Sequence, residues 1–146
     1  MGKKIEIAWY GKHFGEEPPI SGSKGSGTIF FCRCNLKCVF CQNWQISQEK
    51  FSCDTVSEVE LLKIILGLQK EGVENINLVS PTTWAFWLKD ILLEAKKNGL
   101  TIPIVWNSNG YEDIRIVREI GEIGAVDIFL PDYKYSDNKL AVEYSS

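Results

Sequence analysis

Short apolar runs alternate with amphipathic helical patterns along most of this chain, and the alternation restricts the folds that it can adopt. Runs typical of β-strands occupy residues 28–31, 76–79, 102–106 and 126–130. Between them lie three segments with apolar residues at helical spacing: one that ends at Gly72, then residues 84–98 and 112–122. Strands that alternate with helices form parallel sheets with right-handed crossovers. We therefore predict an α/β fold with four parallel strands.

The first predicted helix has the clearest boundaries. Thr55 and Ser57 each precede a glutamate by three residues, which is the pattern of a capping box. Gly72 follows the last apolar position, as a glycine at a helix C-terminus does.

Polar or metal-binding residues follow each predicted strand at its carboxyl end. These strand ends are residues 32–41, 80–83, 107–110 and 131–134. Ligand sites of parallel sheets form at the carboxyl ends of the strands. We therefore expect one edge of the sheet to carry the chemistry.

The cysteines are concentrated at the first of these strand ends. Four of the five lie within residues 32–41, and the fifth is Cys53. An odd and tightly bunched set is a poor disulfide framework and favours metal or redox chemistry. Cys34, Cys38 and Cys41 have C-x3-C-x2-C spacing. Three thiolates on one short loop can bind three irons of a cluster and leave the fourth iron open to a small chelating molecule.

Other uses of these residues remain open at this point. The three cysteines could join Cys32, Cys53 or His13 in a structural zinc site, which would make the chain a zinc-stabilised interaction module. Cys38 and Cys41 alone could form a thioredoxin-like dithiol. We expect Cys32 and Cys53 not to be ligands, with Cys53 a core or surface thiol. For His13, the only histidine, we expect a surface or structural role.

Charge and hydropathy narrow the class of protein. The net charge is −3 and no basic tract is present, so we do not expect nucleic acid as a partner. No apolar run approaches the roughly 20 residues of a membrane span. Residues 1–10 lack the long apolar stretch of a signal peptide. We therefore expect a cytoplasmic protein without membrane contact.

The cysteine loop resembles the signature of the radical S-adenosylmethionine (SAM) superfamily, C-x3-C-x-aromatic-C, with Phe40 at the aromatic position. Further segments resemble the subgroup related to pyruvate formate-lyase-activating enzymes. These are residues 14–22, 25–31, 38–44, 79–82 and 130–135. The match runs from about Phe14 to Ser146.

This resemblance implies a partial parallel (β/α) barrel of the radical SAM type. The superfamily core resembles six βα units, so four predicted strands imply that the C-terminal part is missing. We predict an irregular N-terminal arm over residues 1–27, which are rich in Gly, Pro and Ser, and a truncated radical SAM core domain over residues 28–146. Four strands cannot close a barrel. We therefore expect an exposed edge with apolar residues such as Phe129 and Leu130, and pairing with a missing C-terminal half, another polypeptide or a second copy.

The resemblance also implies cofactors and a reaction. Cys34, Cys38 and Cys41 would hold a [4Fe–4S] cluster, and SAM would chelate its open iron. An external one-electron reductant would feed the cluster. SAM would then split into methionine and a 5′-deoxyadenosyl radical that abstracts hydrogen from a substrate. In enzymes that this chain resembles, the substrate is a glycine of a partner protein, a glycyl-radical enzyme. The alternative is a truncated fragment that binds the cluster or SAM without turnover.

Residues for SAM follow from the same resemblance. Where many superfamily members carry Gly-Gly-Glu, this chain has Ser80 and Thr82, whose hydroxyls can accept hydrogen bonds from the SAM amino group. The expected surround of the SAM carboxylate consists of Asn107, Ser108, Asp132 and Lys134. Simpler interpretations remain: Thr82 caps the next helix, residues 107–110 form a plain turn, and Asp132 pairs with Lys134 at the surface.

Overall fold

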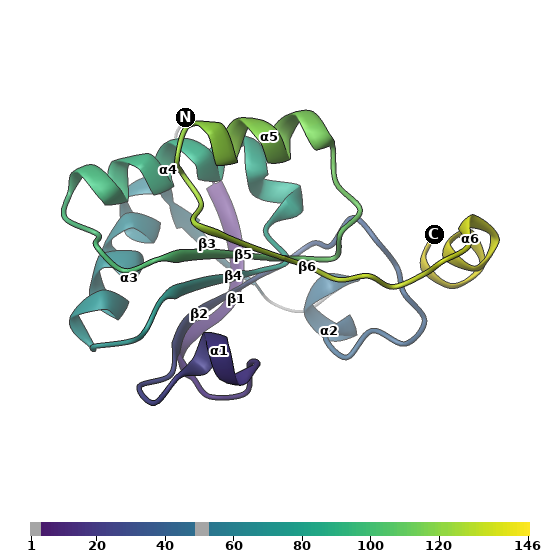
Figure 1. Ribbon diagram of the computed structural model, residues 1–146, viewed down its shortest axis with the longest axis horizontal. Helices are drawn as coiled ribbons and strands as arrows, with labels where there is room; N and C mark the ends of the chain where they lie inside the picture. The colour runs from purple at the N-terminus through teal and green to yellow at the C-terminus, as the bar shows by residue number, and fades with distance from the viewer. Residues whose placement is uncertain (1–3, 49–52) are drawn as a thin grey trace.

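A computed structural model describes residues 4–48 and 53–146 of the chain. Six strands form one sheet in the order β3-β1-β2-β4-β5-β6 (Figure 1). The strands are β1 (Lys4–His13), β2 (Ser26–Phe31), β3 (Asp54–Ser57), β4 (Ile76–Val79), β5 (Ile104–Ser108) and β6 (Ile128–Pro131). The helices are α1 (Pro18–Ser21), α2 (Trp44–Ser47), α3 (Glu58–Lys70), η1 (Thr82–Trp84), α4 (Ala85–Lys97), α5 (Ile114–Glu122) and α6 (Asn138–Ser145).

The parallel part of the sheet contains the predicted strands. β2, β4, β5 and β6 pair in parallel, with Ile29 beside Leu78 and Leu78 beside Trp106. The prediction of an α/β fold with a parallel sheet is thus confirmed. The sheet is not closed, because β3 and β6 form its two edges. This arrangement is compatible with a partial barrel.

The prediction of an irregular arm is wrong for residues 4–13. These residues form β1, which pairs antiparallel with β2 on one side and with β3 on the other. Ile5 and Ile7 are buried at alternate positions, so the strand contributes to the core. The Gly- and Pro-rich sequence is instead confined to the connection that contains α1.

The core lies between the sheet and the helices on one face. Figure 1 shows α4 and α5 on that face and α1 on the other. Leu61 and Ile65 of α3 and Leu88 and Leu92 of α4 are fully buried against the apolar strand residues. At roughly 1.5–3 kcal/mol for each buried side chain, this layer supplies most of the driving force for folding.

Helix ends follow the predicted chemistry with two corrections. Ser57 forms the capping box of α3 with Glu60, whereas Thr55 lies inside β3. Asp113 caps α5, which therefore begins two residues later than predicted. In the described part of the chain, no helix combines the length and the apolar character needed to cross a bilayer.

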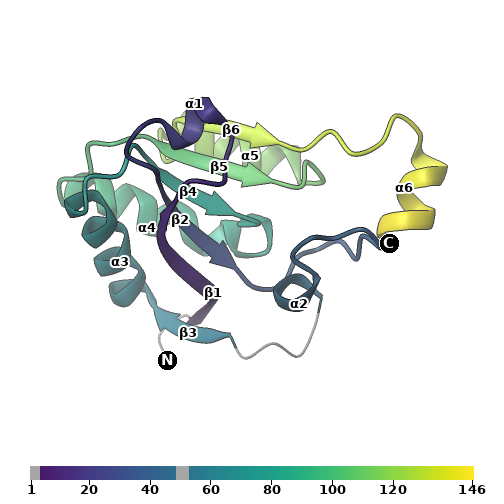
Figure 2. The same ribbon diagram turned by 90° about the horizontal axis from the view of Figure 1, so that it is seen from below.

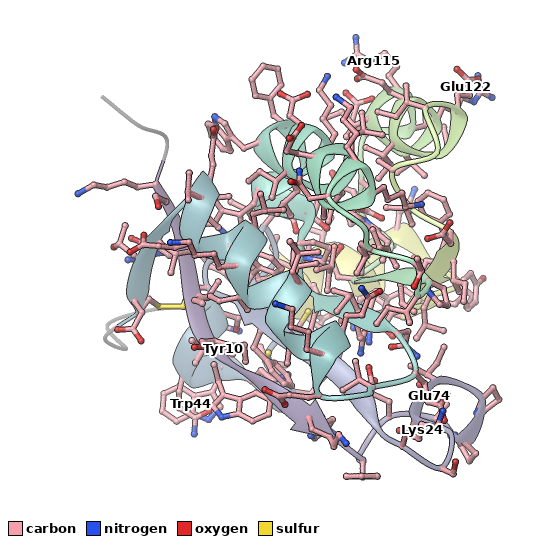
Figure 3. All side chains as sticks on the ribbon, turned by 90° about the vertical axis from the view of Figure 1, so that its left-hand side faces the viewer. Tyr10, Lys24, Trp44, Glu74, Arg115 and Glu122 are labelled. Atoms are coloured by element: carbon pink, nitrogen blue, oxygen red, sulfur yellow. A yellow bond between two sulfur atoms is a disulfide. The ribbon has the colours of Figure 1, made fainter. Side chains whose placement is uncertain are left out.

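A disulfide joins Cys32 and Cys53, which corrects the expectation that Cys53 is a free thiol (Figure 3). Ile7 of β1 pairs with Phe31 at the end of β2 and with Asp54 at the start of β3. This register brings the neighbouring cysteines to a Cα–Cα distance of 6.6 Å. The pairing depends on β1, which the sequence pattern did not reveal.

Candidate functional site

A cavity of about 620 Å³ lies at the carboxyl ends of the parallel strands. It brings together nine of the ten residues predicted for the site: Cys34, Cys38, Phe40, Cys41, Ser80, Asn107, Ser108, Asp132 and Lys134. The tenth, Thr82, does not line it. The roles of these residues stay predictions.

The three remaining cysteines are free thiols on the loop between β2 and α2. Each sulfur has a polar side chain beside it. Asn109 Nδ2 donates to Cys34 Sγ at 3.2 Å, and Ser145 Oγ donates to Cys38 Sγ at 2.8 Å. Cys41 Sγ lies 3.3 Å from Ser47 Oγ. Hydrogen bonds to sulfur are a regular feature of iron–sulfur sites.

Neighbouring elements hold the start of this loop. Thr83 Oγ1 donates to the carbonyl of Arg33 at 2.5 Å, and Trp84 Nε1 donates to the carbonyl of Cys32 at 2.8 Å. Arg33 itself has φ 70°, in the left-handed region. Such a backbone persists only where its surroundings fix it, as these bonds from η1 do.

The C-terminal segment holds the middle of the loop. Figure 2 shows α6 beyond the end of the sheet, on the same side of the molecule as α2. The amide of Lys37 donates to the carbonyl of Ser145 at 3.0 Å, and the amide of Val39 donates to the carbonyl of Tyr144 at 2.9 Å. Phe40, which is 54% exposed, meets Tyr135 edge-on.

Ser80 and Thr82 follow β4 but have different surroundings. Ser80 lines the cavity in a left-handed conformation, φ 57°, and its amide donates to the carbonyl of Asn107 at 3.0 Å. Thr82 instead donates to Glu112 at 3.0 Å. The same carboxylate accepts from Trp106 at 2.8 Å, and its other oxygen accepts from Ser108 at 2.5 Å. Thr82 therefore helps to fix the strand ends and does not face the cavity.

Asn107 connects the strand ends with the N-terminal segment. Its amide donates to Glu16 at 3.3 Å, and Glu16 lines the cavity with Glu17 and His13. Burial raises the pKa of the Glu16 carboxyl, an effect that the nearby His13 offsets only in part. His13 was expected to have a surface or structural role, and it contributes to the cavity wall and packs edge-on against Phe30.

Asp132 and Lys134 form an ion pair at 2.5 Å on the cavity wall. Burial lowers the pKa of Lys134, but Asp132 and the sulfurs of Cys38 and Cys34 outweigh it, and the pKa is raised above its usual value. The ion pair predicted as the simpler interpretation is thus present, and it lies inside the cavity.

Sequence reasoning missed four contributors: Glu16, Asn109, Glu112 and Ser145. The Gly-Glu-Glu-Pro segment was interpreted as loop-forming and as part of the family resemblance, but neither interpretation gave Glu16 a place in the site, although two adjacent acids were a usable signal. Ser145 offered no signal, because nothing in the sequence links it to Cys38.

The surroundings of the three free sulfurs bear on the alternative of a structural zinc site. Among the described residues, no group of three or more His, Cys, Asp or Glu side chains is arranged to hold one ion. Cys32 and Cys53 are bonded to each other, so neither can complete a zinc site with the loop. Three separate thiols around one cavity suit a multi-iron body in which each thiolate binds its own iron.

Comparison with known proteins agrees with this chemistry. The model of the family described as Radical SAM superfamily matches residues 28–143. The chain is also 38% identical over 135 residues to a protein of Methanocaldococcus jannaschii named Uncharacterized protein MJ0674. That alignment covers 87% of this chain and 37% of the relative, so the chain spans little more than a third of the relative's length.

Proposed function

Because the chain belongs to the radical SAM superfamily, we propose that Cys34, Cys38 and Cys41 bind a [4Fe–4S] cluster and that the cavity beside them binds SAM. One observation carries the proposal: three free thiols line the same cavity as the polar ends of β4, β5 and β6. When bound, the cluster supplies one electron, received from an external reductant, for cleavage of SAM to methionine and a 5′-deoxyadenosyl radical.

The chain's own residues have distinct tasks in this proposal. Lys134 carries its positive charge toward the sulfurs and offers it to the SAM carboxylate, and the ion pair with Asp132 holds the ammonium group in position for this. Ser80 and Asn107 present hydroxyl, amide and backbone groups to the amino acid part of SAM. Phe40 covers one wall.

The finer proposal is an oxidoreductase related to pyruvate formate-lyase-activating enzymes, which acts in the cytoplasm on a glycine of a partner protein. The resemblance of residues 14–22 and 130–135 to that subgroup supports it. A partner substrate is also compatible with the exposure of Phe40, which lines the cavity, and of Tyr133, which lies between Asp132 and Lys134 in the sequence.

The cluster is tested by anaerobic reconstitution with iron and sulfide. We expect a brown protein, and we expect Cys34→Ala, Cys38→Ala or Cys41→Ala each to abolish the cluster. Cys32→Ala and Cys53→Ala serve as matched controls and should retain it. Stoichiometric zinc without sulfide would refute the proposal.

A second experiment tests SAM binding and cleavage. Its addition should perturb the electron paramagnetic resonance spectrum of the reduced cluster, and Asp132→Asn or Asn107→Ala should weaken that effect. Methionine and 5′-deoxyadenosine should then form under reductant. A perturbed spectrum without these products would favour the second candidate, a binding fragment without turnover, which the open sheet edge makes a specific alternative.

A further inference from the structure

A chain of hydroxyl groups ends on the sulfur of Cys38. Ser145 Oγ donates to Cys38 Sγ at 2.8 Å, and Tyr135 Oη lies 2.7 Å from Ser145 Oγ. Ser145 is 3% exposed and Cys38 is 8% exposed, so the contact is shielded from solvent.

The direction of these bonds follows from the proton count. A serine hydroxyl has one hydrogen, and here that hydrogen points to the sulfur. The proton between Tyr135 and Ser145 must therefore come from the phenol. Each donor strengthens the next, because a hydroxyl that accepts a hydrogen bond becomes a better donor.

The backbone keeps this chain of hydroxyls in place. The carbonyls of Ser145 and Tyr144 accept from the amides of Lys37 and Val39, which flank Cys38 on either side. The ring of Tyr135 packs edge-on against Phe40, at 6.1 Å between centroids. Ser145 is thus fixed relative to the sulfur by contacts that do not involve its own side chain.

The three cysteines differ in the polar contact that each sulfur makes and in their burial. The bond to Cys38 is the shortest of the three polar contacts, and Cys38 is the one buried thiol among them. A hydrogen bond to a cluster sulfur ligand stabilises the reduced state most, because added electron density resides partly on sulfur, and burial strengthens the effect.

We propose that Ser145 and Tyr135 are positioning residues that raise the reduction potential of the cluster through Cys38. This inference rests on the proposed cluster and requires neither SAM binding nor turnover. It gives residues 135–145, at the far end of the chain, a direct part in setting how easily the site accepts its electron.

The test is a redox titration of reconstituted protein followed by electron paramagnetic resonance. Ser145→Ala should shift the midpoint potential to a lower value, and Tyr135→Phe should shift it in the same direction by less. Ser145→Thr restores a hydroxyl and should recover most of the shift. Ser146→Ala is the matched control, because the neighbouring Ser146 hydroxyl donates to the carbonyl of Val142 and touches no cysteine. Midpoints of Ser145→Ala and Tyr135→Phe equal to that of the unaltered protein would overturn the inference.

A second measurement covers a variant that loses its cluster. In the metal-free protein, alkylation of Cys38, followed by mass spectrometry, should become several-fold faster in Ser145→Ala than in Ser146→Ala, with Cys34 unchanged. Equal rates at Cys38 would show that Ser145 does not hold the sulfur and would refute the inference. If the unaltered protein forms no cluster at all, the proposed function fails instead, so the two failures are distinguishable.

Discussion

Gly110 lies where the loop after β5 passes closest to the loop after β6. A Cβ atom at this position would lie 2.4 Å from the carbonyl oxygen of Asp132, and the residue has φ 75°. The amide of Asp132 donates to the carbonyl of Ser108 in the same contact. The absence of a side chain at Gly110 therefore sets how closely the two predicted SAM-binding strand ends approach.

Gly110→Ala should destabilise the protein and displace Asp132. The left-handed backbone alone costs roughly 1–2 kcal/mol, and the clash adds about 1–3 kcal/mol. Gly72→Ala is a matched control, because Gly72 also has φ 75° but has no atom within 4 Å of the added Cβ. Urea denaturation should show the larger loss of unfolding free energy for Gly110→Ala, and equal losses would show that the close approach is absent.

Glu16 gives a pH-dependent prediction. Its pKa is raised in the folded state, chiefly by burial, so the folded protein binds the proton more tightly than the unfolded chain does. The ionised carboxyl therefore opposes folding increasingly as the pH rises above the ordinary value of about 4.3. Glu16→Gln should raise the melting temperature at pH 7.5 and have little effect near pH 4, where both states are protonated. Glu17→Gln, at the exposed neighbouring residue, is the control and should change the melting temperature less. An unchanged melting temperature for Glu16→Gln at pH 7.5 would contradict the prediction.

At the scale of elements, the disulfide links the end of β2 to the start of β3 across a separation of 21 residues. Closing a loop of this size stabilises a protein by about 3 kcal/mol in the chain-entropy model. Cys53→Ser should lower the unfolding free energy by roughly 2–4 kcal/mol without reductant. Reductant should remove the difference between the variant and the unaltered protein. Equal denaturation midpoints under oxidising conditions would show that the disulfide does not form.

The strands differ in how readily the sequence predicts them. β2, β4, β5 and β6 were predictable because each is an apolar run followed by a helical pattern or a polar loop. β1 and β3 were missed. β3 is a four-residue edge strand that pairs with Lys4 to Ile7 of β1, and β1 pairs with β2 as well, so both strands depend on partners elsewhere in the chain. The short α6 was missed for a similar reason, because its contacts lie with the cysteine loop far earlier in the chain.

The candidate site likewise has features that the sequence could predict and features that it could not. The gathering of the three cysteines at one cavity was predictable because they lie on one short loop, and their role as ligands stays a prediction. Asp132, Asn107 and Ser80 were predictable because strand ends of one parallel sheet converge. Thr82 was misplaced, because sequence alone could not show that Glu112 competes for its hydroxyl. Hydrogen-bond partners chosen among distant polar residues depend on tertiary structure and leave no local pattern.

At the scale of the whole molecule, the main feature is the open edge of the sheet that β6 forms. Ile128 and Phe129 are each 38% exposed there, as expected for a sheet that is not closed. An unpaired edge strand with exposed apolar side chains is a site for pairing with another strand.

We expect the chain to self-associate with rising concentration, measured by analytical ultracentrifugation. Ile128→Lys should weaken the association, because a charge on an edge strand opposes pairing. Val59→Lys, at an apolar residue of α3 that is 61% exposed, should leave it unchanged. A segment that pairs with β6, supplied in trans, should raise solubility and SAM cleavage together. A stable, cooperatively melting monomer that cleaves SAM unaided would contradict this account.

The contact between Ser145 and Cys38 also has a consequence for the order of events during synthesis. The two residues are 107 positions apart. At roughly 5–20 residues per second, about 5–20 s pass on the ribosome between their additions. During this interval the cysteine loop is translated but lacks the contacts that Tyr144 and Ser145 make with it in the folded protein. The loop can therefore reach the structure described here only after Ser145 has been added, and insertion of the proposed cluster into this arrangement is expected only after that step.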